Sequence, residues 1–312
     1  MVKYLYFHDW QQLLYVSFSA RLGGGQAQFA LAALFIDLLP FHSRNMIKSA
    51  VTISLVPELR GGPWVLWDDL VSSCRKAAKH GFDGVELFTR DDSVPGLGAI
   101  LEETGLGLAA VGTGAGKVLH GLTLIDPDPS KRQQARVFVK SMVKFGAKYN
   151  APAIIGSMQG VHGGNREDSL KLLADSLEEL GEYAESQEVP IIYEPLNRYE
   201  TNLFNRLAEA AEFVDTLNTN AVFLLADLFH MNIEEEDIAQ SIKDAASVIG
   251  HVHFADTNRR PVGLGHLEVG PVASALKGIG YSGYVSAEAF DFPNPDKAAG
   301  QTIHSFRKYF RD

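Results

Sequence analysis

The 312-residue sequence predicts an α/β fold, a single (β/α)8 TIM barrel with an extra N-terminal leader. Beyond residue 45, eight short apolar runs alternate with eight amphipathic stretches, which is the unit count of this barrel. Runs such as AVFLLA at 221–226 are apolar throughout, as in parallel sheets that are covered on both faces. A doubly wound open sheet is the alternative, because alternation alone does not show that a sheet closes.

The first half of the barrel is predicted from four strand–helix pairs. Runs of β-forming residues indicate strands at 51–55, 84–88, 107–111 and 152–156. Apolar residues at helical spacing indicate helices at 67–79, 96–103, 128–149 and 165–187. Gly81 provides a left-handed cap after the first helix, Asp128 begins the third and Asn165 caps the fourth. The glycine-rich GTGAGK at 112–117 lacks the Walker spacing and is predicted to be a barrel loop.

The second half repeats this alternation. Strands are predicted at 189–194, 221–227, 250–255 and 283–289. Helices are predicted at 206–217, 237–248, 269–278 and 297–310. No interdomain linker is recognisable after residue 45, so one barrel domain is expected over 46–312.

Residues 1–45 differ in character from the rest. The apolar run at 29–39 contains Asp37 and is shorter than the roughly 20 residues that a membrane span needs. Pro40 follows it where a signal peptide has a small-residue cleavage site. We expect an N-terminal extension that is disordered or arises from an upstream start codon, with a cleavable targeting segment as the alternative.

Charge and cysteine content exclude several classes of partner. The net charge is −10 and no basic stripe occurs, which disfavours nucleic acid as a partner. No stretch long enough to span a membrane is present. The single cysteine, Cys74, cannot form an internal disulfide and is expected to be a buried thiol, which fits a reducing, cytoplasmic setting.

Four residues with metal-binding side chains stand at the ends of the last four predicted strands: Glu194, Asp227, His253 and Glu288. A single glutamate or histidine at a strand end usually has a structural role, so the coincidence of four carries the argument. The carboxyl ends of barrel strands converge on one mouth, where these side chains are expected to meet. Three buried carboxylates are costly without compensation, and a divalent cation is the simplest compensation. Oxygen ligands with one imidazole suit Mn²⁺, Mg²⁺ or Co²⁺ better than a structural Zn²⁺.

Polar side chains on the following loops could bind a sugar. Glu200, His230 and Arg259 lie just beyond the strands that carry the first three ligands, where barrel active sites are built. His266, in GLGH at 263–266, is a weaker candidate. The alternative for each is a solvated loop residue.

The sequence resembles the ketose 3-epimerases of the xylose-isomerase-like TIM-barrel superfamily, the D-tagatose and D-psicose (allulose) 3-epimerase group. The resemblance rests on EPLNRYETN at 194–202 and on the spacing of the four ligands, and it is specific over about 189–290. DLFHMNIEE and ADTNRRPVGLGH also resemble a branch that acts on keto-sugar acids. The resemblance implies one Mn²⁺, Co²⁺ or Mg²⁺ on the four ligands, with Mn²⁺ the first candidate. It also implies a dimer or tetramer.

The predicted function is epimerisation at C3 of a ketose or keto-sugar acid through an enediolate. Removing the proton next to a ketone and returning one to the other face requires an acid and a base on opposite sides of the substrate. Glu194 and Glu288 are predicted to fill these roles, as in the resembling family. In that family, the residues that correspond to Glu200, His230 and Arg259 contact substrate oxygens.

Other functions remain possible on the same residues. An aldose–ketose isomerase and a keto-polyol dehydratase would use the same enediolate. An abasic-site endonuclease would need more histidines and a basic groove, which the acidic charge disfavours. A non-catalytic sugar-binding protein would not need an acid–base pair.

Overall fold

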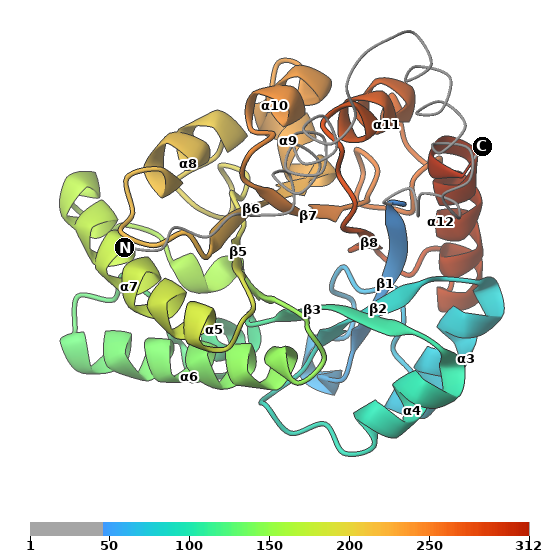
Figure 1. Ribbon diagram of the computed structural model, residues 1–312, viewed down its shortest axis with the longest axis horizontal. Coiled ribbons are helices and arrows are strands. Elements are labelled where there is room, and N and C mark those ends of the chain that lie inside the picture. The colour runs from blue at the N-terminus through green and yellow to red at the C-terminus, as the bar shows by residue number, and fades with distance from the viewer. Residues whose placement is uncertain (1–45, 312) are drawn as a thin grey trace, which may run out of the picture. The chain divides into compact units, whose positions relative to one another are not determined.

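The computed structural model describes residues 46–311 and shows a closed parallel barrel (Figure 1). The strands follow one another around the barrel in chain order, and β1 pairs with β8 to close it. The strands are β1 (Lys48–Ser54), β2 (Gly84–Phe88), β3 (Gly107–Gly112), β4 (Ala153–Ile155), β5 (Ile191–Tyr193), β6 (Val222–Asp227), β7 (Ile249–His253) and β8 (Tyr284–Ala287). The predicted (β/α)8 barrel is confirmed, and the open sheet is excluded.

Eight helices follow the eight strands at the predicted places. They are α3 (Leu70–His80), α4 (Leu97–Thr104), α6 (Pro129–Ala147), α7 (Arg166–Ser186), α8 (Leu207–Val214), α10 (Ile238–Asp244), α11 (Val269–Gly278) and α12 (Pro295–Phe310). The predicted caps form: Asp128 accepts a hydrogen bond from the Ser130 amide, and Asn165 accepts one from the Glu167 amide. Gly81 ends α3 with a φ of 85°, in the left-handed region.

Two short helices were not predicted. α5 (Ala115–His120) begins inside the glycine-rich segment that the sequence indicates as a loop. Gly116 packs there against Met158 and Phe138 with no room for a side chain, so glycine serves close packing rather than flexibility. α9 (Leu228–Glu234) begins directly after β6 and carries His230. Single 3₁₀ turns at Pro57–Leu59 and Ser157–Gln159 complete the fold.

The barrel has an apolar shell and a partly polar interior. The large core lies between strands and helices, where Ile53, Leu87 and Tyr193 are fully buried. Inside the barrel, four residues of β3 to β6 form a separate apolar cluster: Ala110, Ile154, Ile192 and Leu225. The corresponding interior positions of β2 and β7 carry buried polar groups instead, among them Glu86 and His251. Polar interior positions are unusual in such barrels, which are normally filled by branched apolar residues.

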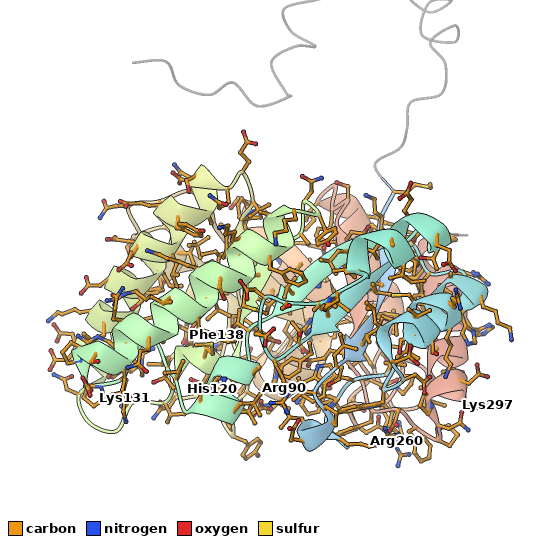
Figure 2. The ribbon with its side chains drawn as sticks, turned by 90° about the horizontal axis from the view of Figure 1, so that it is seen from below. Arg90, His120, Lys131, Phe138, Arg260 and Lys297 are labelled. Carbon is orange, nitrogen blue, oxygen red and sulfur yellow. The ribbon has the colours of Figure 1, made fainter. Side chains whose placement is uncertain are left out.

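The segments that follow the strands gather at one end of the barrel. Arg90, which follows β2, His120 of α5 and Arg260, which follows β7, lie toward the same end in the side view (Figure 2). Cys74 is buried in α3, and burial raises the pKa of its thiol to about 11. Within residues 46–311, none of the helices has the length and apolar character to cross a membrane.

Several predictions concern residues or properties outside this description. The predicted leader at 1–45 lies outside the described residues, and the division into 1–45 and 46–312 stays a prediction. The cellular location and the oligomeric state also stay predictions.

Candidate active site

The four predicted ligands meet at the mouth of the barrel. Glu194 directly follows β5, Asp227 ends β6, His253 ends β7 and Glu288 directly follows β8. Each offers one ligand atom, and these atoms all lie within 4.8 Å of one another. The Nδ1 atom of His253 is 3.3 Å from Asp227 Oδ2 and 3.4 Å from Glu194 Oε1. It is 3.8 Å from Glu288 Oε2.

The chemistry of this cluster fits a divalent cation. Glu194, Asp227 and His253 are buried, and Glu194 Oε1 has no hydrogen-bond partner within residues 46–311. Buried carboxylates that converge on one point repel one another, and a cation relieves this repulsion. Three carboxylates and one imidazole form an oxygen-rich ligand set.

The ionisation of the cluster reflects this crowding. Burial raises the pKa of Glu194, and the charge of Glu288 adds to this effect, while His253 acts against both. Burial alone would lower the pKa of His253, but Glu86 and Glu288 outweigh it and raise that pKa well above its ordinary value. In the ion-free site, a proton on His253 therefore compensates part of the negative charge.

Asp227 uses its two oxygens differently. Oδ1 caps α9 by accepting hydrogen bonds from the amides of Phe229 (2.7 Å) and His230 (3.2 Å). Oδ2 faces His253 in the cluster. Burial opposes the ionised form of Asp227, but His230 and His253 hold its pKa below the usual range. This single carboxylate thus links the cluster to the helix that carries His230.

A buried carboxylate supports His253 from behind. Glu86 Oε1 lies 3.1 Å from His253 Nε2, and Glu86 Oε2 lies 2.8 Å from His251 Nε2. Burial would raise the pKa of Glu86, but the two histidines hold it well below its usual range. These three side chains also lie close enough together to hold an ion, and the contact between Glu86 and His253 is a hydrogen bond that orients the imidazole. A bond to Nε2 leaves Nδ1 facing the cluster, as in many carboxylate–histidine–metal arrangements.

Arg259 joins the cluster to the loop after β5. Its Nη2 donates to Glu288 Oε2 at 2.6 Å, and its Nη1 donates to Glu200 Oε1 at 3.3 Å. The guanidinium lies 4.8 Å from the centre of the Phe229 ring. Arg259 has a φ of 57°, a left-handed conformation that few non-glycine residues adopt. The backbone and both partners therefore fix this cation beside Glu288.

His230 is brought to the cluster, whereas His266 is not. His230 Nε2 lies 3.9 Å from Glu194 Oε1 and 3.8 Å from Asp227 Oδ2. His266 is exposed, and its backbone amide donates to Thr257 Oγ1. It does not line the pocket described next, so its predicted contact with substrate is unsupported by its position.

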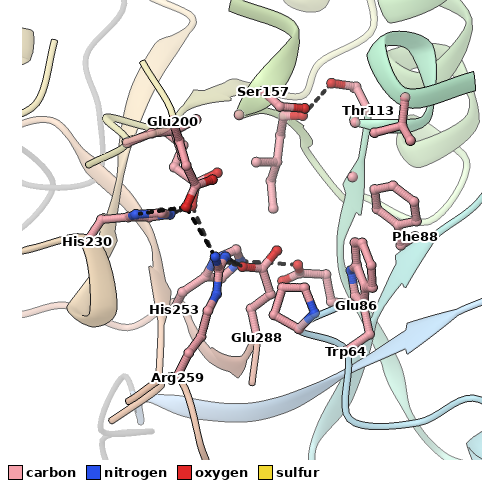
Figure 3. A pocket seen from close by; sticks show the side chains of 18 of the residues that line it. Trp64, Glu86, Phe88, Thr113, Ser157, Glu200, His230, His253, Arg259 and Glu288 are labelled. Atoms are coloured by element: carbon pink, nitrogen blue, oxygen red, sulfur yellow. Dashed lines mark hydrogen bonds and ion pairs between the residues drawn. The ribbon is translucent and has the colours of Figure 1, made fainter. Parts of the chain in front are cut away.

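A pocket of about 180 Å³ opens over the cluster. Figure 3 shows Glu200, His230 and Arg259 on one side and Trp64 and Phe88 on the other. The Trp64 and Phe88 rings are 4.3 Å apart, centre to centre, and form an aromatic wall. The remaining lining includes small and weakly polar residues such as Gly112, Thr113, Gly114 and Ser157.

Sequence reasoning missed the aromatic wall and Glu86. Glu86 has a recognisable signal, because it is the one carboxylate inside the apolar strand GVELF. Trp64 lies between β1 and α3, in a segment whose position relative to the mouth the sequence does not indicate. Phe88, the last residue of β2, looks like any other strand residue.

The fold and the cluster define a class: a (β/α)8 barrel with a carboxylate-rich ligand set at the carboxyl ends of its strands. The chain belongs to the xylose isomerase-like TIM barrel family, whose sequence profile matches residues 74–309. The relatives described next confirm the predicted resemblance to the ketose 3-epimerase group of this superfamily.

Several relatives are named as sugar epimerases. The chain is 31% identical to the D-psicose 3-epimerase of Ruminiclostridium cellulolyticum over 249 residues, which covers 76% of this chain and 82% of the relative. It is 36% identical to the 3-dehydro-D-guloside 4-epimerase of Escherichia coli over 118 residues, 38% of this chain and 45% of the relative. A solved D-psicose 3-epimerase with D-tagatose, from Clostridium cellulolyticum, matches with a TM-score of 0.69 and 25% identity, covering 85% and 99% of the two chains. The prediction of an enzyme of the isomerase class is confirmed.

Proposed function

We propose that the protein is a metal-dependent epimerase acting at C3 of a ketose or keto-sugar acid. The observation that carries this proposal is the placement of two glutamates, Glu194 and Glu288, in one ligand cluster at the floor of a pocket. They come from β5 and β8, so they approach the pocket from different sides of the barrel. The relatives named 3-epimerases support the same reaction class.

A divalent cation, Mn²⁺ before Mg²⁺ or Co²⁺, would be held by Glu194, Asp227, His253 and Glu288. When bound, it supplies Lewis-acid stabilisation for the negative charge that develops on the substrate oxygens. Other groups of the chain hold these ligands in place. Glu86 orients His253, and the two backbone amides at the start of α9 orient Asp227.

The proton transfer is assigned to the glutamate pair. One carboxylate takes the proton from C3, the electron pair of that C–H bond forms the C2–C3 double bond, and the carbonyl electrons move to the C2 oxygen. The other glutamate, protonated, then delivers its proton to the opposite face of C3, and the ketone re-forms. Each positioned acid or base contributes on the order of 10²–10⁴-fold. The reverse reaction exchanges the two roles.

The polar side of the pocket is assigned to the sugar's oxygens. Glu200 can accept hydrogen bonds from hydroxyl groups, while Arg259 and His230 can donate to oxygens. His266 would act only after moving from its exposed position. The aromatic wall of Trp64 and Phe88 would pack against the carbon atoms of the sugar.

The pocket favours a substrate without a phosphate group. Among the described residues that line it, Arg259 is the one arginine or lysine, and this guanidinium already contacts Glu288 and Glu200. The charge of the proposed ion would be offset by the three carboxylates that hold it, so a phosphate dianion would find no free arginine or lysine among the described residues of the pocket.

A substrate screen tests the proposal. The ion-free protein and the protein with Mn²⁺, Mg²⁺ or Co²⁺ are incubated in D₂O with free ketoses, keto-sugar acids and ketose phosphates, and products are followed by proton NMR. We expect deuterium at C3 and a C3 epimer, only with metal and only from an unphosphorylated sugar. An aldose product would indicate an isomerase, and loss of water would indicate a dehydratase. Exchange at C4 of a 3-keto sugar would match the Escherichia coli relative instead. No exchange with any sugar and metal would refute the proposal.

A further inference from the structure

Asn197 contacts His230 through two N–H groups. Its side-chain Nδ2 lies 2.7 Å from His230 Nδ1, and its backbone amide lies 3.2 Å from the same atom. Both residues are buried, with exposed fractions of 2% and 1%. His230 Nδ1 therefore receives two donors where water has little access.

The orientation of the Asn197 amide follows from its other contacts. Its Oδ1 accepts a hydrogen bond from the Tyr199 backbone amide at 2.9 Å, so the oxygen must point to that donor. Its Nδ2 also donates to Glu200 Oε1 at 3.0 Å. A flipped amide would place its oxygen against a carboxylate and its nitrogen against a backbone N–H. The network is consistent in one orientation only.

The loop that carries Asn197 is fastened to the helix that carries His230. Arg198 donates to Glu234, near the end of α9, from its backbone amide (2.7 Å) and from its guanidinium (3.0 and 2.8 Å). Glu234 is largely buried in this pair, with 6% of its side chain exposed. Asn197 and His230 thus keep their relative position through two independent links.

We infer that Asn197 is a positioning residue that fixes the tautomer of His230. Two donors at Nδ1 leave no place for a proton there, so the neutral ring carries its proton on Nε2. Nε2 faces the pocket and has no hydrogen-bond partner within residues 46–311. It lies 3.8–3.9 Å from ligand oxygens of Asp227 and Glu194. His230 thereby presents a hydrogen-bond donor next to the atoms that would hold the ion.

The consequence for catalysis rests on the proposed function. A preorganised donor at a position where charge develops on a substrate oxygen stabilises the transition state, and losing one such donor typically costs about 10²–10³-fold in rate. The other tautomer would present a bare nitrogen, which repels that oxygen. The same amide holds Glu200, so one side chain orients two groups that face the sugar.

Nitrogen NMR of histidine-labelled protein tests the tautomer without metal or substrate. His230 is assigned as the signal set that disappears in His230→Gln. We expect its Nδ1 to resonate as an unprotonated nitrogen and its Nε2 as a protonated one. In Asn197→Asp, the carboxylate attracts a proton to Nδ1, so the Nδ1 signal should move to the protonated range. A protonated Nδ1 in the unaltered protein, or an unchanged spectrum in Asn197→Asp, would overturn the inference.

Asn202→Asp is the matched control. It introduces the same charge in the same loop, but Asn202 is exposed and bonds to His162 instead. It should leave the His230 signals and the activity unchanged. On a substrate found by the screen, Asn197→Asp should lose about 10²-fold in kcat/KM with retained Mn²⁺ binding. An altered tautomer with full activity would reject the catalytic consequence. If no sugar reacts, the NMR result still decides the positioning role, so the two failures are distinguishable.

Discussion

Gly156 and Glu194 approach each other so closely that a side chain on Gly156 would overlap the Glu194 carboxylate. Gly156 directly follows β4, and the Glu194 amide donates to the carbonyl of neighbouring Ile155. The glycine therefore shapes one side of the ligand cluster although it has no ligand atom of its own.

Gly156→Ala should displace Glu194 and weaken Mn²⁺ binding by about 10–100-fold, the usual scale for disturbed support of a metal ligand. The affinity can be measured by calorimetric titration, with a thermal melt to show that the fold is kept. Gly163→Ala is the control, because a side chain there meets nothing within 4 Å. Equal Mn²⁺ affinity in the two variants would show that Gly156 does not shape the cluster.

Glu194→Gln and Glu288→Gln should each lose epimerisation by about 10²-fold or more, because one of the two faces of C3 then lacks its acid or base. The remaining glutamate can still remove a proton from the epimer that faces it. Each variant should thus exchange the C3 proton of one epimer with D₂O and not that of the other. Proton NMR of the two epimers, incubated separately, measures this.

One result would contradict that assignment, and a second has to be distinguished from it. Epimerisation at the unaltered rate in either variant rules out the pair. Loss of Mn²⁺ binding would instead indicate that the amide fails as a ligand, so each variant is titrated with Mn²⁺ before assay.

Glu86→Gln should weaken Mn²⁺ binding by about 10–100-fold. Glutamine has one acceptor oxygen where Glu86 offers one to each of two histidines, so His253 or His251 loses its partner. Glu102→Gln, on the exposed face of α4, removes the same charge and should have no effect. Unchanged affinity in Glu86→Gln would show that His253 is oriented by packing alone.

Binding of Mn²⁺ should release a proton at neutral pH. The pKa of His253 in the ion-free site is raised above its usual value of 6.5, so this histidine holds a proton until the pH exceeds the raised pKa. The ion displaces that proton, and the apparent affinity should rise up to about tenfold per pH unit below the raised pKa. Titration in buffers of different ionisation enthalpy measures the released proton. A binding enthalpy independent of the buffer would contradict this.

The barrel could be predicted because its strands are continuous apolar runs and its helices have a clear apolar face. The ends of α11 were predicted to the residue, since Val269 to Gly278 shows regular helical spacing. α9 was missed because Asp227 looks like a ligand, and the same residue is the N-cap of that helix. The sequence pattern therefore indicated the ligand role of Asp227 and not its role as an N-cap.

The four ligands could be predicted because parallel strands bring their carboxyl ends together whatever their separation in sequence. Contacts across the barrel interior could not be predicted in the same way. Glu86 and His251 are 165 residues apart and meet only because β2 and β7 face each other across the interior. The place of Trp64 in the aromatic wall depends on loop conformation, and so does the exposed position of His266.

The double use of Asp227 has a mechanical consequence. One oxygen faces the cluster, while the other begins α9, which places His230 one helical turn later. The separation between the ion and this imidazole is therefore set by regular backbone geometry rather than by a pliable loop. A filled cluster should slow hydrogen exchange at the amides of Phe229 and His230. The first turn of α9 would then report occupancy of the cluster.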